Sequence, residues 1–150
     1  MTYNTTMNNF IFPVQLIPDE EDGGYVVTFR DLPEAITQGD SIAECLMEAV
    51  DCLEEAIAAR IDDNKDIPQP SVLQAGEYLV ELPLTMIFKT LVYQAFREKE
   101  INKAQLARQL NLDEKEIRRI LNPRHGTKLS TIERVLSALG KKIEVRIVHY

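Results

Sequence analysis

The segment from Lys103 to Asn122, KAQLARQLNLDEKEIRRILN, constrains the fold of this chain more than any other. Two helices that cross steeply around a tight turn need a small residue near the crossing and a turn residue that tolerates positive φ. Ala107 and Asn111 fill these two places, because Asn enters the left-handed region at modest cost. Asp113 then begins the second helix, with Glu116 three residues later as in a capping box. The spacing predicts a helix-turn-helix.

The outward surface of the second helix is rich in cations. The apolar residues of Glu114 to Leu121 face inward, and the outward residues are Glu114, Lys115, Arg118 and Arg119. Lys115 and Arg118 lie three apart on one face, where Arg can bond guanine bidentately and Lys can reach bases or phosphates. We therefore expect base contacts from these two residues and a backbone contact from Arg119. The alternative is a helical hairpin with a solvated basic face.

Phosphate contacts are expected from both flanks of this helix pair, where backbone N–H groups or cations are available. The candidates are Asn102, Lys103, Gln105, Arg124, His125, Thr127 and Lys128. His125 fits an ordinary loop residue equally well. A helix capped by Thr85 precedes the pair, and a helix capped by Ser130 or Thr131 and ended by Gly140 follows it. The arrangement resembles the repressor-like Cro/C1 (XRE) domain.

Charge divides the chain near Pro83. Residues 1–82 carry 17 acidic and 3 basic side chains, a net charge of −14, whereas residues 83–150 carry 7 acidic and 14 basic ones, a net charge of +7. This asymmetry predicts two domains, 1–82 and 83–150, the first suited to a cationic partner and the second to a polyanion such as DNA. Two solvated faces of one globule are the alternative.

The first domain is predicted to be a small β-β-β-α-β layer. Strands are expected at 9–17, 25–29 and 35–38, with two glycines at the first hairpin turn and Asp31-Leu32-Pro33 as a break. An amphipathic helix from Ile42 to Ile61 follows, capped by Asp40 or Ser41 and with Ile42 on its inward face. After a loop with two prolines, residues 77–82 form the fourth strand.

The chain closes with a segment of alternating apolar residues from Lys141 to Tyr150, which predicts a strand with one buried face. A lone strand after a helical domain needs a pairing partner. We expect it to pair with the same strand of a second subunit, giving a homodimer or a higher homo-oligomer.

Several site classes have little support in the sequence. No apolar stretch approaches the roughly 18 residues of a membrane span, so we expect a cytoplasmic protein without membrane contact. Cys45 and Cys52 lie two helical turns apart, about 10 Å and beyond disulfide reach. With only His125 and His149 available and no ligand cluster, we expect no metal and no other cofactor.

An ordered set of short motifs in the first domain resembles that of HicB antitoxins. The set comprises Asp22-Gly23-Gly24-Tyr25, residues 29–35 (FRDLPEA), residues 37–41 (TQGDS) and Glu44. The resemblance covers residues 10–61, and the C-terminal half agrees with the helix-turn-helix subgroup. Arg30 departs from the family, which often has proline there.

The resemblance implies an α+β protein, in which a partial RNase H-like β-β-β-α-β domain precedes an all-α helix-turn-helix domain with a C-terminal strand. It also implies that the first domain masks a small basic mRNA-cleaving HicA toxin and that the second represses the shared operon. A −14 domain suits a cationic toxin. The candidate toxin-binding residues are Glu21, Asp22, Tyr25, Asp31 and Glu34. Each carboxylate could also be ordinary solvated surface.

Other functions compete with this interpretation. One is a ligand-sensing transcriptional repressor whose N-terminal domain binds a small molecule, and another is an inhibitor whose helix-turn-helix only dimerises. An active nuclease would need carboxylates that converge on two metal ions about 4 Å apart. The acids here lie in turns and on one helix face. We therefore expect no enzymatic activity.

Overall fold

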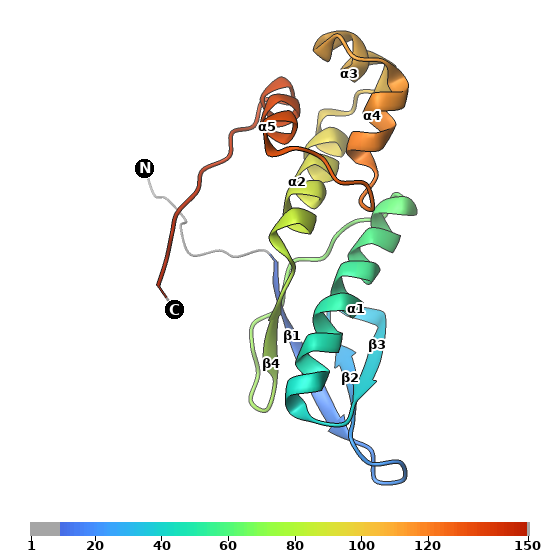
Figure 1. Cartoon of the computed structure of the whole chain (residues 1–150), viewed down its shortest axis with the longest axis vertical. Coiled ribbons are helices and arrows are strands. Elements are labelled where there is room, and N and C mark those ends of the chain that lie inside the picture. Colours follow the sequence, from blue (N-terminus) through green and yellow to red (C-terminus); the bar gives the residue numbers. More distant parts are fainter. Residues whose placement is uncertain (1–9, 150) are drawn as a thin grey trace. The chain divides into compact units, whose positions relative to one another are not determined.

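The computed structural model describes residues 10–149 and has an α+β fold (Figure 1). Its first elements are β1 (Ile11–Pro18), β2 (Tyr25–Phe29), β3 (Leu32–Gly39), α1 (Ile42–Asp62) and β4 (Tyr78–Glu81). The remaining helices are α2 (Leu84–Lys99), α3 (Lys103–Leu110), α4 (Glu114–Leu121) and α5 (Leu129–Ala138). Contacts divide the chain into an N-terminal unit that ends at Leu84 and a C-terminal unit that begins at Thr85.

The N-terminal unit contains a four-stranded antiparallel sheet with the order β3-β2-β1-β4. The third strand is longer than the sequence suggested, since it begins at Leu32 and includes Pro33. Proline is tolerated there because β3 is an edge strand, so its missing N–H removes no ladder bond on the open side. The predicted start of β1 at Asn9 lies outside the described residues.

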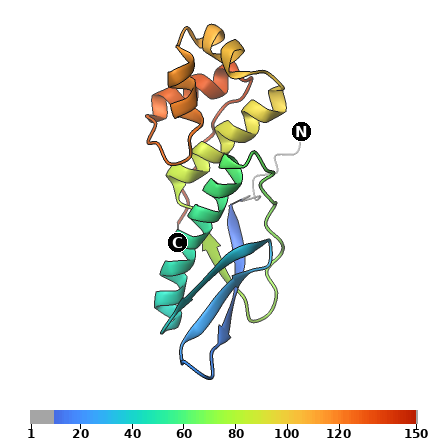
Figure 2. The same cartoon turned by 90° about the vertical axis from the view of Figure 1, so that its right-hand side faces the viewer.

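Helix α1 packs on the sheet, as the turned view in Figure 2 shows. The fully buried side chains here include Phe12, Val14, Val27, Phe29, Leu53 and Ile57. Ser41 caps the helix, since its Oγ accepts a hydrogen bond from Glu44 N at 3.1 Å, as predicted. The inward placement of Ile42 was wrong, because Ile42 is 40% exposed and buried Cys45 occupies the inward position of the first turn.

Two glycines let the chain fold tightly at this end of the sheet. A Cβ on Gly39 would lie 2.9 Å from both N and Sγ of Cys45. A Cβ on Gly24 would lie 2.4 Å from Gly39 O, and the φ of Gly24 is +69°. The neighbouring Gly23 also has a positive φ, of +74°. Larger side chains cannot fit between the β1–β2 turn, the end of β3 and the start of α1.

The C-terminal unit packs α2 to α5 around one core. Its most deeply buried members are Val92, Leu106, Ile117, Ile120, Ile132 and Val135. Two predicted caps were wrong. Helix α2 already begins at Leu84, so Thr85 lies inside its first turn, and α5 begins at Leu129, where Lys128 takes the capping position without a side-chain bond.

The C-terminal end of α5 agrees with the prediction. Gly140 has φ +78°, and Lys141 N donates to Leu136 O at 2.8 Å, which is the bond pattern of a glycine-terminated helix. Residues 141–149 then form no strand in the single chain. Val145 is 81% and Ile147 95% exposed, whereas Ile143 packs against the core. Pairing with a second subunit therefore stays a prediction, and Tyr150 lies outside the described residues.

None of the helices in the described part of the chain combines the length and apolar character needed to cross a bilayer.

Candidate functional sites

The turn between α3 and α4 has the geometry that its sequence predicts. Asn111 adopts the left-handed conformation, with φ 56° and ψ 45°, and Leu112 N donates to Ala107 O at 2.9 Å. Asp113 caps α4 by accepting a hydrogen bond from Glu116 N at 2.8 Å. These local bonds fix the angle at which α4 leaves α3.

The cations predicted for base and backbone contacts with DNA lie on the solvent side of α4. Lys115, Arg118 and Arg119 are all exposed, whereas Ile117 and Ile120 are buried. Arg118 lies 4.0 Å from Glu114 and Arg119 lies 3.3 Å from Glu116, with all four side chains roughly half exposed. Exposed pairs of this kind contribute only about 0–1 kcal/mol, so a phosphate or a base edge can displace them.

The predicted phosphate contacts flank α4 on two segments. Asn102 and Gln105 form a full capping box at the start of α3, since each side-chain oxygen accepts a hydrogen bond from the backbone N–H of the other. The side-chain oxygens of Asn102 and Gln105 are thus used within the capping box, while their amide NH₂ groups can donate hydrogen bonds to phosphate. Lys103, Arg124, His125 and Lys128 are exposed. Thr127 is half-buried.

Sequence reasoning missed Lys89 of α2. The residue is 7% exposed, and its Nζ donates to Ile120 O at 2.8 Å, to Arg119 O at 3.2 Å and to Thr127 Oγ1. Burial lowers the pKa of Lys89 to about 8. A lysine inside the apolar stripe of α2 was the available signal, but its acceptors are 30 to 38 residues away in the sequence.

In the N-terminal unit, part of the predicted acidic site lies around the β1–β2 hairpin. Asp19 Oδ1 accepts hydrogen bonds from the N–H groups of Glu21 and Asp22 at 3.1 and 3.2 Å, which holds these two exposed acids at the tip. A polar depression of about 500 Å³ lies beside it, lined in part by Asp22, Tyr25, Asp40, Glu44 and Glu48. Carboxylates from the hairpin and from the start of α1 therefore face one hollow.

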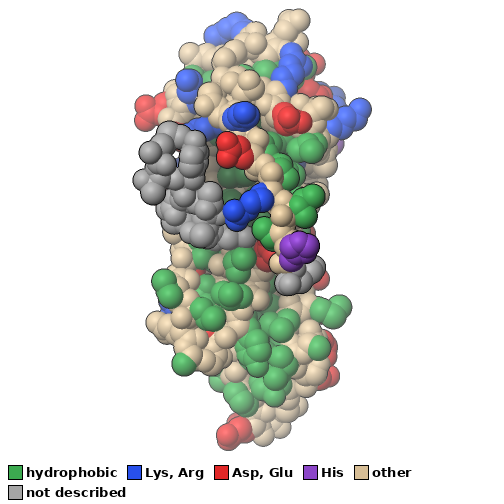
Figure 3. Space-filling view, turned by 90° about the vertical axis from the view of Figure 1, so that its left-hand side faces the viewer, with side chains coloured by type: hydrophobic (Ala, Val, Ile, Leu, Met, Phe, Trp, Pro, Cys, Tyr) green, Lys and Arg blue, Asp and Glu red, His purple; other side chains and the backbone are tan. Residues whose placement is uncertain are grey.

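A second hollow of about 470 Å³ runs between the edge strand β3 and α1, and we call it the edge groove. Its apolar lining includes Ala35, Ile36, Cys52, Ala56 and Ala59, and its acidic lining consists of Glu34, Glu48, Asp51 and Glu55. Glu48 and Thr37 line both hollows, so the acidic surface is continuous. The face drawn in Figure 3 differs, since hydrophobic side chains gather there over the N-terminal unit and acidic ones lie mainly at its margins.

Glu34 is not a free acid in this groove. Arg60 of α1 donates to both of its carboxylate oxygens, at 2.6 and 3.0 Å. These hydrogen bonds lower the pKa of Glu34 and raise that of Arg60. A bidentate pair of this kind fixes β3 to α1.

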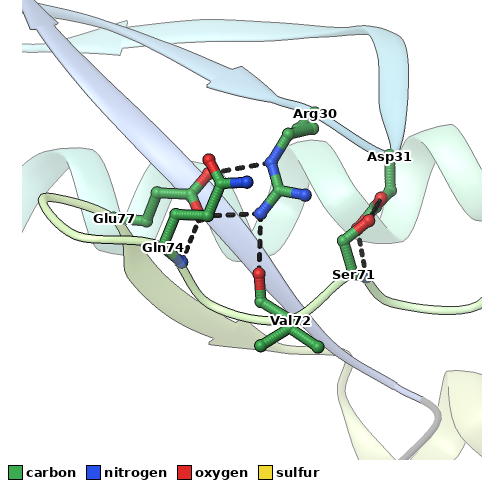
Figure 4. A network of polar contacts seen from close by, with 6 residues as sticks. All are labelled: Arg30, Asp31, Ser71, Val72, Gln74 and Glu77. Carbon is green, nitrogen blue, oxygen red and sulfur yellow. Dashed lines mark hydrogen bonds and ion pairs between the residues drawn. The ribbon is translucent and has the colours of Figure 1, made fainter.

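Asp31 belongs to a different part of the unit, the polar network of Figure 4. It accepts hydrogen bonds from both N and Oγ of Ser71. Next to it, Arg30 donates to Glu77 at 2.7 and 3.2 Å and to Val72 O at 2.8 Å, and the hydrogen bond to Arg30 lowers the pKa of Glu77. The network fastens the loop before β4 to the β2–β3 turn. Asp31 is therefore engaged in a structural contact, away from Glu21 and Asp22.

The two cysteines are free thiols, and burial raises the pKa of both Cys45 and Cys52. Neither has the lowered pKa of a reactive nucleophile. Among residues 10–149, no group of three His, Cys, Asp or Glu side chains is placed to hold a metal ion.

Comparisons with known proteins point to one family. Residues 11–91 match the model described as the HicB_like antitoxin of bacterial toxin-antitoxin systems. The chain is 39% identical to Antitoxin HicB of Escherichia coli (strain K12) over 137 residues, which is 91% of this chain and 99% of the relative. It is 38% identical to Antitoxin HicB 1 of Photorhabdus laumondii over 94% of this chain and 89% of the relative. Antitoxin HicB of Pseudomonas fluorescens is 29% identical over 89% and 92%.

Proposed function

Because the chain belongs to the HicB-like antitoxin family of bacterial toxin–antitoxin systems, we propose that its N-terminal unit neutralises a HicA-like mRNA-cleaving toxin and its C-terminal unit represses the operon that encodes both. The observation that carries the proposal is the charge division, since the −14 and +7 halves of the sequence coincide with two separately packed units. One unit suits a cationic protein and the other suits DNA. Neither role requires catalysis.

The toxin-facing surface in this proposal is the edge groove together with the hairpin hollow. A toxin that binds RNA must present cations, and the acids of the groove other than Glu34, whose charge Arg60 already offsets, offer complementary charge around an apolar floor. Asp22 and Tyr25 border the hollow, Glu21 is exposed next to Asp22 at the hairpin tip, and Glu34 borders the groove. Because Asp31 is engaged by Ser71 in the polar network, we assign it a supporting role.

Charge reversal tests this surface. Asp51→Lys places a cation in the edge groove and should weaken toxin binding at least tenfold by repulsion and loss of complementarity. Asp63→Lys, at the C-terminal end of α1 and outside the groove lining, changes the same charge and should leave binding within about twofold. Equal affinity of both variants for purified toxin, measured by titration calorimetry, would assign toxin binding to another surface.

The DNA-binding part of the proposal takes α3 and α4 as a Cro/C1-like helix-turn-helix with α4 as the recognition helix. Its support is the left-handed Asn111, the capped start of α4 and the exposed cations Lys115, Arg118 and Arg119. In such units the second helix enters the major groove and the flanking segments contact phosphates. A single unit of this kind binds weakly, so two are expected to act together.

The terminal segment supplies a means of joining two subunits. Val145 is 81% and Ile147 95% exposed, which is unusual for β-branched residues that alternate along a chain. Pairing with the same segment of a second copy would cover part of this apolar surface and place two recognition helices on one duplex. We propose a homodimer on this basis.

The decisive experiment is co-expression with the adjacent small open reading frame. The antitoxin role requires a basic partner of about 60 residues that arrests growth alone and fails to do so with this protein. A neighbouring gene without toxicity, or toxicity that this protein does not relieve, would refute neutralisation and favour a small-molecule sensor. A mobility-shift assay with the operon's upstream DNA tests the operator binding on which repression depends.

A further inference from the structure

Lys89 is a buried cation whose contacts connect three parts of the C-terminal unit. Lysine is almost never fully buried without partners. The ammonium group of Lys89, carried by α2, donates to two backbone carbonyls at the end of α4 and to the hydroxyl of Thr127. All three acceptors are neutral, so the charge is held by dipoles.

The three acceptors of Lys89 lie at the end of α4 and in the loop that follows it. The carbonyls of Arg119 and Ile120 belong to the last turn of α4, where the helix dipole favours a cation. The Arg119 carbonyl also accepts a hydrogen bond from Asn122 N at 3.2 Å, so Lys89 adds to the cap at this helix end. Thr127 lies in the 122–128 loop that also carries Arg124, His125 and Lys128. One buried group therefore fixes the end of the recognition helix and the loop after it.

Burial of this charge has a cost. Desolvation lowers the pKa of Lys89 to about 8, which means that its environment disfavours the charged form. An apolar residue of similar length, such as methionine, would fill the same volume without that cost. The charge is thus better explained by the hydrogen bonds it makes than by packing.

We propose that Lys89 is a positioning residue for DNA binding, which holds α4 and the 122–128 loop in one arrangement so that the cations of both reach the same duplex in register. The proposal rests on the operator binding proposed above. Base readout needs side chains held within about 0.5 Å of their productive geometry, whereas attraction to phosphates tolerates looser placement. Lys89 is buried and does not itself contact phosphate, so its loss should reduce specificity and leave the salt dependence unchanged.

The test compares full-length variants by fluorescence anisotropy, on a duplex from the operon's upstream region and on a shuffled duplex, at several salt concentrations. Lys89→Met should reduce the ratio of specific to non-specific affinity at least tenfold, with a salt slope equal to that of the wild type. Lys99→Met is the matched control, because Lys99 is an exposed lysine in the last turn of the same helix. It should keep the wild-type ratio.

Thr127 supplies a second, milder test. Thr127→Val removes the hydroxyl and should lower the ratio about three- to tenfold at an unchanged salt slope, whereas Thr127→Ser keeps the hydroxyl and should retain the ratio. An equal loss of affinity for both duplexes with a smaller salt slope would instead mean that Thr127 contacts phosphate directly, and would count against the positioning role. The Lys89→Met/Thr127→Val variant should bind no more weakly than Lys89→Met alone, because both changes break one contact. The two single variants of Thr127 decide the question if circular dichroism shows that Lys89→Met does not fold.

The results of these measurements separate failure of the positioning role from failure of operator binding. A folded Lys89→Met protein with the wild-type specificity ratio refutes the positioning role while operator binding stands. Equal loss in Thr127→Val and Thr127→Ser also refutes it, since the hydroxyl would then be irrelevant. Wild-type protein that does not distinguish the two duplexes refutes operator binding itself, and the positioning role with it.

Discussion

Replacement of Arg118 by alanine is the most direct test of the recognition helix. The Arg118 side chain is 57% exposed, and Glu114 lies 4.0 Å from its guanidinium group. An exposed ion pair of this kind contributes about 0–1 kcal/mol, so the free energy of unfolding should fall by less than about 1 kcal/mol. Any large loss of DNA affinity in this variant therefore arises at the interface and not from unfolding.

The expected loss follows from the contact that Arg118 is placed to make. A bidentate arginine–guanine pair discriminates by about 1–3 kcal/mol, or about 5- to 150-fold in affinity. A dimer on a palindromic site loses this contact twice, so the affinity for the operator should fall by about 2–6 kcal/mol. Binding to a shuffled duplex should fall only slightly, since it depends mainly on phosphate attraction.

The assay is a mobility shift at fixed salt with the operon's upstream DNA, together with toxin neutralisation in growing cells. Arg118→Ala should abolish the specific complex and leave neutralisation intact, because the N-terminal unit is unchanged. Arg119→Ala is the companion variant and should weaken binding to both duplexes with a smaller salt slope. Wild-type operator affinity in Arg118→Ala would contradict the assignment of α4 as the recognition helix.

Three further predictions concern stability and assembly. Asp31→Ala should lower the free energy of unfolding of the N-terminal unit by about 1–3 kcal/mol, because two hydrogen bonds from Ser71 lose their acceptor. An unchanged Tm in thermal denaturation would show that other contacts hold the loop before β4. Deletion of residues 142–150 should reduce the mass seen by light scattering to that of a monomer, and a truncated protein that stays dimeric would exclude the terminal segment from dimerisation. Lys89 should make the C-terminal unit more stable as pH rises from about 8 to 10.5, because the unfolded chain then binds a proton that the folded chain has lost. The slope is at most about 1.4 kcal/mol per pH unit, and it should appear as the difference in free energy of unfolding between the wild type and Lys89→Met in chemical denaturation at matched pH.

The parts of the fold that the sequence predicted well depend on local chemistry. The left-handed turn at Asn111 and the cap at Asp113 require only the conformational preference of one side chain and bonds within three residues. Helix α1 was predicted almost to its observed ends for the same reason, since periodicity and a Ser cap mark it. Such signals are present in any window of a few residues.

The features that the sequence did not predict depend on distant partners. The structural use of Asp31 follows from Ser71, which lies 40 residues later, and Arg30 similarly finds Glu77 at a separation of 47 residues. The length of β3 was underestimated because a Pro33 in isolation indicates a break, and only its place at the sheet edge makes it acceptable. No local pattern contains these pairings.

The cations of the C-terminal unit show why composition alone cannot define a DNA interface. Its positive charge includes exposed side chains such as Arg118, and also a buried one, Lys89, whose ammonium group is turned inward onto the end of α4. Both kinds count equally toward the net charge of +7, yet the exposed ones can release counterions from DNA and the buried one can only fix geometry. Mutation of the two kinds should therefore separate salt-dependent attraction from sequence readout. Helix periodicity assigned the buried face of α4 correctly, so the exposed cations of that helix could be identified from the sequence.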